Sequence, residues 1–117
     1  MVEKTPEQLD AIFHGLANAT RRDILLQVAR KERTVNELAE QYEMTLQAVS
    51  KHLRVLIDAG LVAQSREGRI RRCRINYPPL QSAANVLDEY RNFWETQFDS
   101  IEAFIQRAKG QPNADDE

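Results

Sequence analysis

The sequence predicts a mainly α-helical fold with one small β-hairpin wing, in the order α-α-α-α-β-β-α. Apolar residues recur at helical spacing along most of the 117 residues, and polar helix-start signals precede these stretches. Only residues 61–77 change to a strand-like pattern, which surrounds a glycine turn. Two short helices followed by a hairpin are the layout of a winged helix-turn-helix.

Length and composition favour one domain, over residues 1–109, followed by a disordered tail over 110–117. The sequence is 42% hydrophobic and contains a single cysteine. It has no run of eighteen apolar residues, and its first residues lack the pattern of a secretory signal. We therefore expect a cytoplasmic protein with no membrane partner.

The first two helices are predicted from their start signals. Thr5-Pro6-Glu7-Gln8 offers an N-cap threonine, a proline at the first helical position and a glutamine that can complete a capping box. Thr20 is expected to cap the second helix, with Asp23 near its positive end. The expected buried positions are Leu9, Ile12, Phe13 and Leu16 in the first helix and Ile24, Leu25 and Val28 in the second.

Residues 34–60 are predicted to form the helix-turn-helix. Thr34 and Glu37 have the spacing of a capping box, and Thr45 caps the next helix. Gly60 is expected to end that helix in the left-handed conformation. Apolar residues of the second helix repeat at three- and four-residue intervals, at Leu46, Val49, Leu53, Leu56 and Ile57.

Residues 61–77 are predicted to form the wing, with Glu67-Gly68 at its turn. In the second strand, alternation puts Arg71, Cys73, Ile75 and Tyr77 on one face and Arg72, Arg74 and Asn76 on the other. Pro78-Pro79 is expected to end the sheet, and a dimerisation helix is expected over 79–109. At 1.5 Å per residue that helix is about 45 Å long, more than the core of so small a domain needs.

The charge of the chain is unevenly distributed. Residues 45–77 carry seven Lys and Arg against two acidic residues, whereas residues 78–117 carry three basic and eight acidic residues. One strongly basic segment in a chain of overall charge −2 indicates a nucleic-acid partner, here double-stranded DNA.

The candidate DNA-binding residues lie in the second helix of the helix-turn-helix and in the wing. They are Thr45, Gln47, Ser50, Lys51, His52 and Arg54, together with Arg66, Arg69 and Arg71. Gln can pair with adenine, and Lys and Arg can contact guanine or phosphate. The alternatives are an ordinary solvated helix face and a charged edge strand that prevents aggregation.

Metal and enzymatic chemistry are not expected, and no cofactor is predicted. The candidate metal ligands Cys73, His14 and His52 have no metal-binding spacing, and no nucleophile elbow or phosphate-binding glycine loop is present. His14 is expected to pack or to cap near the first helix. Cys73 is interpreted as a small core residue, with a redox sensor as the alternative.

Three segments carry a resemblance to known proteins: FHGLANATRRDILLQVA, TVNELAEQYEMTLQAVSKHLRVLIDAGLV and REGRIRRCRINY. Together with the last helix, they resemble the ArsR/SmtB family of bacterial winged-helix repressors. The resemblance implies a homodimer built from the first and last helices that binds a palindromic operator. It also implies that Gln47, Ser50, Lys51, His52 and Arg54 face the groove. Metal-sensing members commonly carry a cysteine pair where this chain has Val35–Leu38, or Asp and His ligands on the last helix. Both sets are missing here, so we expect no metal effector, and no residue cluster identifies another one.

The predicted function is a homodimeric, sequence-specific repressor, with a winged-helix protein-interaction module as the alternative. The predicted dimer interface consists of Leu9, Ile12, Phe13, Tyr90, Trp94, Ile101 and Ile105. The alternative is that the aromatic residues of the last helix pack within the chain, against Leu9, Ile12 and Phe13.

Overall fold

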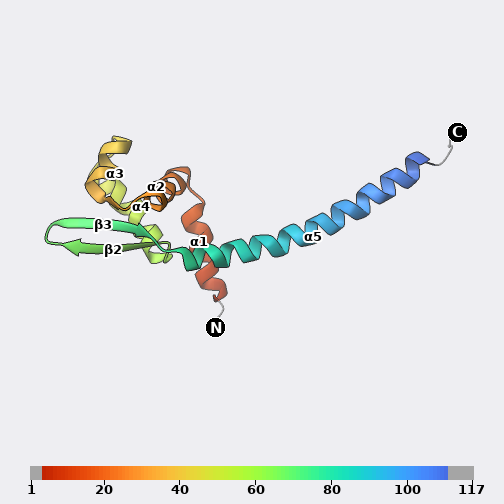
Figure 1. Ribbon diagram of the computed structural model, residues 1–117, viewed down its shortest axis with the longest axis horizontal. Coiled ribbons are helices and arrows are strands. Elements are labelled where there is room, and N and C mark those ends of the chain that lie inside the picture. The colour runs from red at the N-terminus through yellow and green to blue at the C-terminus, as the bar shows by residue number, and fades with distance from the viewer. Residues whose placement is uncertain (1–3, 111–117) are drawn as a thin grey trace. The chain divides into compact units, whose positions relative to one another are not determined.

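A computed structural model describes residues 4–110 of the chain. The elements follow in the order α1 (Pro6–Leu16), α2 (Ala19–Arg30), β1 (Arg33–Thr34), α3 (Val35–Tyr42), α4 (Leu46–Asp58), β2 (Val62–Glu67), β3 (Ile70–Ile75) and α5 (Tyr77–Gly110) (Figure 1). This arrangement confirms the predicted winged helix-turn-helix and adds the short strand β1. The expected tail, 110–117, lies outside the described residues except for Gly110.

The chain divides into two compact units, one up to Ala83 and one from Ala84 onward. The first unit contains α1 to α4, the sheet and the first turns of α5. The second unit is the remainder of α5.

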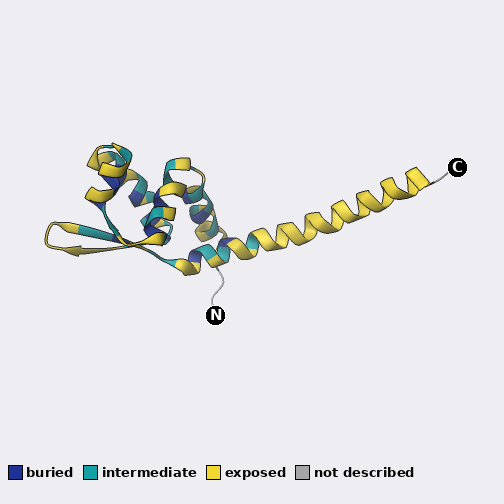
Figure 2. Ribbon diagram, turned by 45° about the horizontal axis from the view of Figure 1, so that its top comes forward, coloured by how far each residue is buried: buried dark blue, intermediate teal, exposed yellow. Residues whose placement is uncertain are grey.

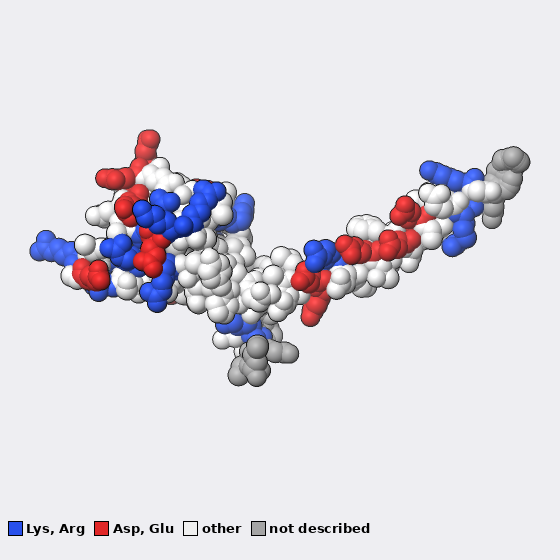
Figure 3. Space-filling view, viewed as in Figure 1, with Lys and Arg blue, Asp and Glu red and all other residues white. Residues whose placement is uncertain are grey.

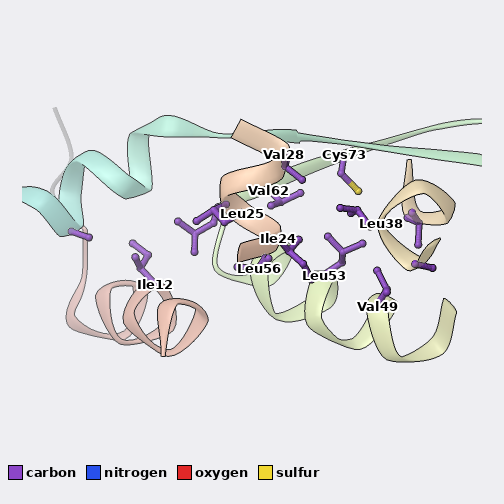
Figure 4. Close-up of a cluster of buried hydrophobic side chains, with 14 residues drawn as sticks. Ile12, Ile24, Leu25, Val28, Leu38, Val49, Leu53, Leu56, Val62 and Cys73 are labelled. Carbon is purple, nitrogen blue, oxygen red and sulfur yellow. The ribbon is translucent and has the colours of Figure 1, made fainter. Parts of the chain in front are cut away.

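The core of the first unit is built from apolar side chains of α1 to α4 and of the strands (Figures 2 and 4). Its largest side chains with less than 2% exposure include Ile12, Ile24, Leu38, Leu53, Leu56 and Leu61. Full burial of one such side chain contributes about 1.5–3 kcal/mol. This core fixes α4 and the hairpin within one rigid unit.

Three of the four predicted threonine N-caps are confirmed. Thr5 and Thr34 each form a full capping box, with Gln8 and Glu37 respectively. The Thr45 hydroxyl accepts a hydrogen bond from the Ala48 N–H at 3.0 Å. Each contact joins residues only three positions apart and satisfies a helix N–H that has no partner inside the helix.

The predicted start of α2 was wrong. Asn18, and not Thr20, is its N-cap, and the Asn18 Oδ1 accepts from the Arg21 N–H at 3.0 Å. Asp23 does not lie in the first turn of α2, and its carboxylate instead accepts a 2.5 Å hydrogen bond from the Tyr42 hydroxyl of α3. Burial, and then this bond, raise the pKa of Tyr42.

Arginines of α2 hold the end of α1. Arg21 donates to the His14 and Gly15 carbonyls at 2.8 and 3.0 Å, and Arg22 donates to the Leu16 carbonyl at 2.8 Å. The His14 carbonyl also accepts a hydrogen bond from the Ala17 N–H at 3.1 Å, and the guanidinium groups give the last carbonyls of α1 further donors. The His14 side chain itself is exposed and does not pack in the core.

The sheet has three antiparallel strands in the order β1-β3-β2. β3 ends at Ile75, two residues before the predicted end, and α5 begins at Tyr77. Pro78 and Pro79 therefore lie in the first turn of α5, where a missing N–H costs nothing, because that N–H has no partner there anyway. Tyr77 is helical and 61% exposed, so it does not share the strand face of Cys73.

Glycine serves the two turns for which it was predicted. Gly60 follows α4 with φ +77°, and Gly68 in the hairpin has φ +62°. Because Glu67 pairs with Ile70, the turn residues are Gly68 and Arg69, one position later than predicted. Glu43 ends α3 with φ +53°, a left-handed residue that the sequence did not indicate.

The part of α5 in the second unit is exposed along its described length, apart from the half-buried Val86 (Figure 2). Its large apolar residues are between 42% and 65% exposed: Leu87, Tyr90, Phe93, Trp94, Phe98, Ile101, Phe104 and Ile105. Between residues 4 and 110, no helix combines the length and the apolar character needed to cross a membrane.

Candidate nucleic-acid interface

α4 presents a polar side to solvent because its apolar stripe faces the core. Val49, Leu53 and Leu56 are at most 1% exposed. Successive helical residues are rotated by about 100°, which puts Gln47, Lys51 and Arg54 on the opposite side, and all three are exposed. Arg54 forms an exposed ion pair with Asp58 at 3.8 Å, and such a pair holds its side chain only weakly.

Ser50 and His52 lie on different flanks of α4. Two positions correspond to a rotation of about 200°, so the side chains point to opposite sides of the polar strip. Ser50 lies on the side of the hairpin, with which it lines a common pocket. His52 is half-buried on the side of α2, where burial and then the nearby Arg21 charge lower its pKa. Of the predicted α4 residues, Ser50 and His52 are thus both half-buried, Ser50 toward the hairpin and His52 toward α2.

Thr45 occupies the N-cap of α4, and its hydroxyl oxygen already accepts the Ala48 N–H. The side chain is exposed, and the hydroxyl proton remains available for a further acceptor. Its structural role is thus to start α4, and a phosphate contact is compatible with that role.

The register of the hairpin decides which arginines share a face. Directly paired residues of antiparallel strands point to the same side. Val62 pairs with Ile75, Gln64 with Cys73, and Arg66 with Arg71. We call this side, which begins in the core and becomes cationic toward the turn, the inner face of the wing.

Arg66 and Arg71 therefore lie on the inner face. They follow the Gln64–Cys73 pair in the direction of the turn. Arg69 is an exposed turn residue. Arg72 pairs with Ser65 and Arg74 with Ala63, which places these two arginines on the outer face. In the view of Figure 3, arginine side chains lie at the free end of the hairpin, with an acidic group beside them. Of the predicted wing residues, Arg69 and Arg71 thus line pockets together with residues of α4, whereas Arg72 and Arg74 lie on the outer face.

Sequence reasoning missed Gln64. Its Nε2 donates to the Cys73 Sγ at 3.7 Å, and its side chain lines the pocket between α4 and the wing. The signal was available in the alternation of β2, because Gln64 lies between Val62 and Arg66 on the same face.

Cys73 is fully buried, and in Figure 4 its sulfur points into the core near Val28 and Leu38. Burial raises the pKa of the thiol, and the Gln64 hydrogen bond and the Arg71 charge oppose that shift. A neutral, enclosed thiol behaves as a small apolar residue. The structure therefore supports the interpretation of Cys73 as a core residue.

The predicted interface residues differ in the surface they offer. Ile12 is 1% exposed and belongs to the core, so we remove it from the predicted interface. Leu9 and Phe13 are half-buried against the same core, and Tyr90, Trp94, Ile101 and Ile105 are exposed. Over residues 4–110, no three His, Cys, Asp or Glu side chains are grouped so that they could hold a metal ion.

Comparison with known proteins places this geometry in a family. Residues 16–65 match the model of a helix-turn-helix domain. The chain is 42% identical over 80 residues to YuzN of Bacillus subtilis, an uncharacterized HTH-type transcriptional regulator, and the match covers 62% of this chain and 87% of YuzN.

Solved structures agree with this comparison. The ArsR family transcriptional regulator RHA00566 matches with a TM-score of 0.73 and 37% identity, over 80% of this chain and 97% of that one. The homodimeric winged helix-turn-helix DNA-binding domain of Mb0332 from Mycobacterium bovis, a possible ArsR-family regulator, matches with a TM-score of 0.60 and 28% identity, over 78% of this chain and 91% of that one. The chain therefore belongs to the ArsR/SmtB family of DNA-binding winged helix-turn-helix transcriptional regulators.

Proposed function

We propose that this protein is a homodimeric repressor of a palindromic operator, with residues 1–109 acting as one winged-helix domain. The observation that carries the proposal is the position of the polar side of α4 beside the cationic inner face of the wing, within one compact unit. A helix of this kind enters the major groove, while basic residues beside it contact the phosphate backbone.

Within this proposal, the residues have different roles. Gln47 reads a base edge, because its exposed amide can pair with adenine. Lys51 and Arg54 contact guanine or phosphate, and Ser50, Thr45, Arg66, Arg69 and Arg71 contact the backbone. His52 contributes less, since it is half-buried on the flank near α2.

The second unit supports the proposed dimer. On a wheel of about 100° per residue, Leu87, Tyr90, Trp94, Phe98, Ile101 and Ile105 fall within one apolar arc of roughly 140°, together with Phe93 and Phe104. Asp88, Glu95, Asp99 and Glu102 lie opposite, and Figure 3 shows acidic side chains along this helix. A continuous exposed apolar face, such as this arc of eight large side chains, marks an interaction site. The homodimeric state of the Mb0332 domain further supports a second copy of this chain as the partner.

A twofold dimer presents two α4 helices, and the two half-sites then lie about 34–36 Å apart on one side of the DNA. Occupation of such an operator next to a promoter blocks transcription, which is the basis for proposing a repressor. The repressor is also proposed to act without catalysis and without a metal effector.

The test is binding to the DNA upstream of the protein's own gene, measured over a salt series. We expect preference for one duplex over unrelated duplexes and over heparin. A double change of Arg69 and Arg71 to Ala should weaken binding to all sequences and lower the salt slope by about 0.9 per lost phosphate contact. The matched control is the double change of Arg72 and Arg74 to Ala, which removes equal charge from the outer face and should keep most of the slope.

A Gln47→Ala variant should instead change which sequence is preferred, because only base contacts carry sequence information. An unaltered preference profile would remove Gln47 from the reading surface. Binding that salt abolishes and that shows no duplex preference, together with a stable complex with another protein, would favour a protein-interaction module.

A further inference from the structure

An open pocket lies where α4 meets the inner face of the wing. Its volume is about 200 Å³. Its polar lining comes from Ser50, Lys51 and Arg54 of α4, from Gln64 of β2 and from Arg71 of β3. The pocket therefore joins the reading helix and the wing, which are separated in sequence by the turn at Gly60.

The lining has the composition of an anion site. It offers three cationic groups and two neutral hydrogen-bond donors, and no carboxylate lines it. Within the described part of the chain, neither Lys51 nor Arg71 has an acidic partner within ion-pair distance. Arg54 is held only by the weak, exposed pair with Asp58. These positive charges are thus left uncompensated by the protein itself.

The strand register adds an independent observation. Arg66 and Arg71 are directly opposed across β2 and β3. Like charges in opposed positions destabilise a sheet, and an anion between or beside them removes that cost. Arg71 belongs both to this pair and to the pocket, so an anion in the pocket relieves the repulsion.

We propose that this pocket binds one phosphate group of the DNA backbone, held from one side by α4 and from the other by Gln64 and Arg71. A phosphodiester presents two charged oxygens, and arginine can donate to both of them at once. The inference rests on the proposed function and names the group that the α4–wing junction takes. Because both elements hold the same phosphate, this phosphate fixes the position of the wing relative to α4 on the DNA.

The first test places a negative charge in the pocket. Gln64→Glu keeps the size of the side chain and should lower the affinity for the operator duplex by at least about tenfold, because the new carboxylate repels the phosphate. The matched control is Ser65→Glu, which adds the same charge at the next residue, on the outer face. We expect it to have a much smaller effect. Equal losses for the two variants would overturn the proposal.

The second test identifies the phosphate. Neutral methylphosphonates are placed one at a time along each half-site of the operator. One position should cost the wild-type protein about tenfold or more in affinity, yet cost an Arg71→Ala variant little further. An Arg72→Ala variant should still lose the full factor at that position. The proposal is overturned if every methylphosphonate that lowers the affinity of the wild type lowers that of the Arg71→Ala variant equally.

Inorganic phosphate serves as the remaining probe. At constant ionic strength we expect it to compete with the duplex no better than sulfate does. Selective release of the duplex by low-millimolar phosphate, on the order of what a dedicated free-anion site requires, would assign the pocket to a free oxyanion instead. If the wild-type protein prefers no duplex at all, the proposed function fails. If the wild type binds its operator, but the Gln64→Glu and Arg71→Ala variants give the same results as Ser65→Glu and Arg72→Ala, only this inference fails.

Discussion

Single residues along the inner face of the wing change from buried core to exposed, charged surface over neighbouring strand pairs. Cys73 is fully buried, its partner Gln64 is exposed, and the next pair outward, Arg66 and Arg71, is cationic. The Gln64 amide contacts both environments, because one of its hydrogens bonds to the Cys73 sulfur while the group also lines the pocket. A polar residue at this boundary avoids an unsatisfied group in the core.

His52 gives a prediction at the scale of the residue. Burial and the Arg21 charge lower its pKa in the folded state, so the unfolded chain binds a proton more readily. The free energy of unfolding should therefore fall as the pH drops below about 6.5, the ordinary histidine value. Urea unfolding of the wild type and of His52→Gln at pH 7.5 and pH 5.5 measures this, and the variant should lose less stability on acidification.

The matched control for this prediction is His14→Gln, since His14 is exposed in the last turn of α1. This variant shows how much of the change follows from replacing any histidine with glutamine. A His52→Gln variant that loses as much stability as the wild type between the two pH values would show that His52 does not contribute to the acid sensitivity.

Elements are held together by close approach as well as by burial, and the contact of α1 with α4 is one example. A Cβ at Gly15 would lie 3.1 Å from the Leu61 Cδ1 and 3.6 Å from the Leu56 Cδ2. The absence of a side chain thus lets the end of α1 approach the end of α4. That contact contributes to the position of α4 in the first unit.

Gly15→Leu should lower the free energy of unfolding by about 1–3 kcal/mol through overpacking. This loss should exceed the gain of roughly 0.8 kcal/mol that replacing glycine in a helix brings. Gly110→Leu is the matched control, because a Cβ there meets no atom within 4 Å. Denaturant unfolding measures both variants, and equal stability of the two would show that the α1–α4 contact can relax.

The elements also show which predictions local sequence allows. The capping boxes of α1 and α3 and the Thr45 cap were predicted because each involves residues three positions apart. Asn18 was missed because Asn and Thr are both good caps and the two stand only two residues apart. β1 was missed because two residues carry no period, and only their pairing with β3 makes them a strand.

At the scale of the whole molecule, the exposed apolar face of α5 leads to a prediction about assembly. The wild type should sediment as a dimer, and Ile101→Asp should shift it to the mass of one chain, because the change puts a charge in the centre of the apolar arc. Asn92→Asp adds the same charge on the opposite, polar side and should remain a dimer.

Circular dichroism should show that both variants keep their helices. A folded Ile101→Asp variant that still sediments as a dimer would place the interface elsewhere. Operator affinity provides a second measure, since loss of the dimer should remove the energetic link between the two half-sites.

The sequence by itself determined three of the four helix caps, the two turn glycines, the basic segment and the absence of familiar metal-ligand spacings. These features depend on residues close together in the chain, whose hydrogen bonds and charges are readable from order alone. Only the tertiary structure decided that Arg66 and Arg71 oppose each other, that Gln64 joins them beside α4, and that Ile12 lies in the core. Strand register and helix packing depend on contacts between residues distant in sequence, and a shift of β3 by one residue would move its arginines to the other face of the wing.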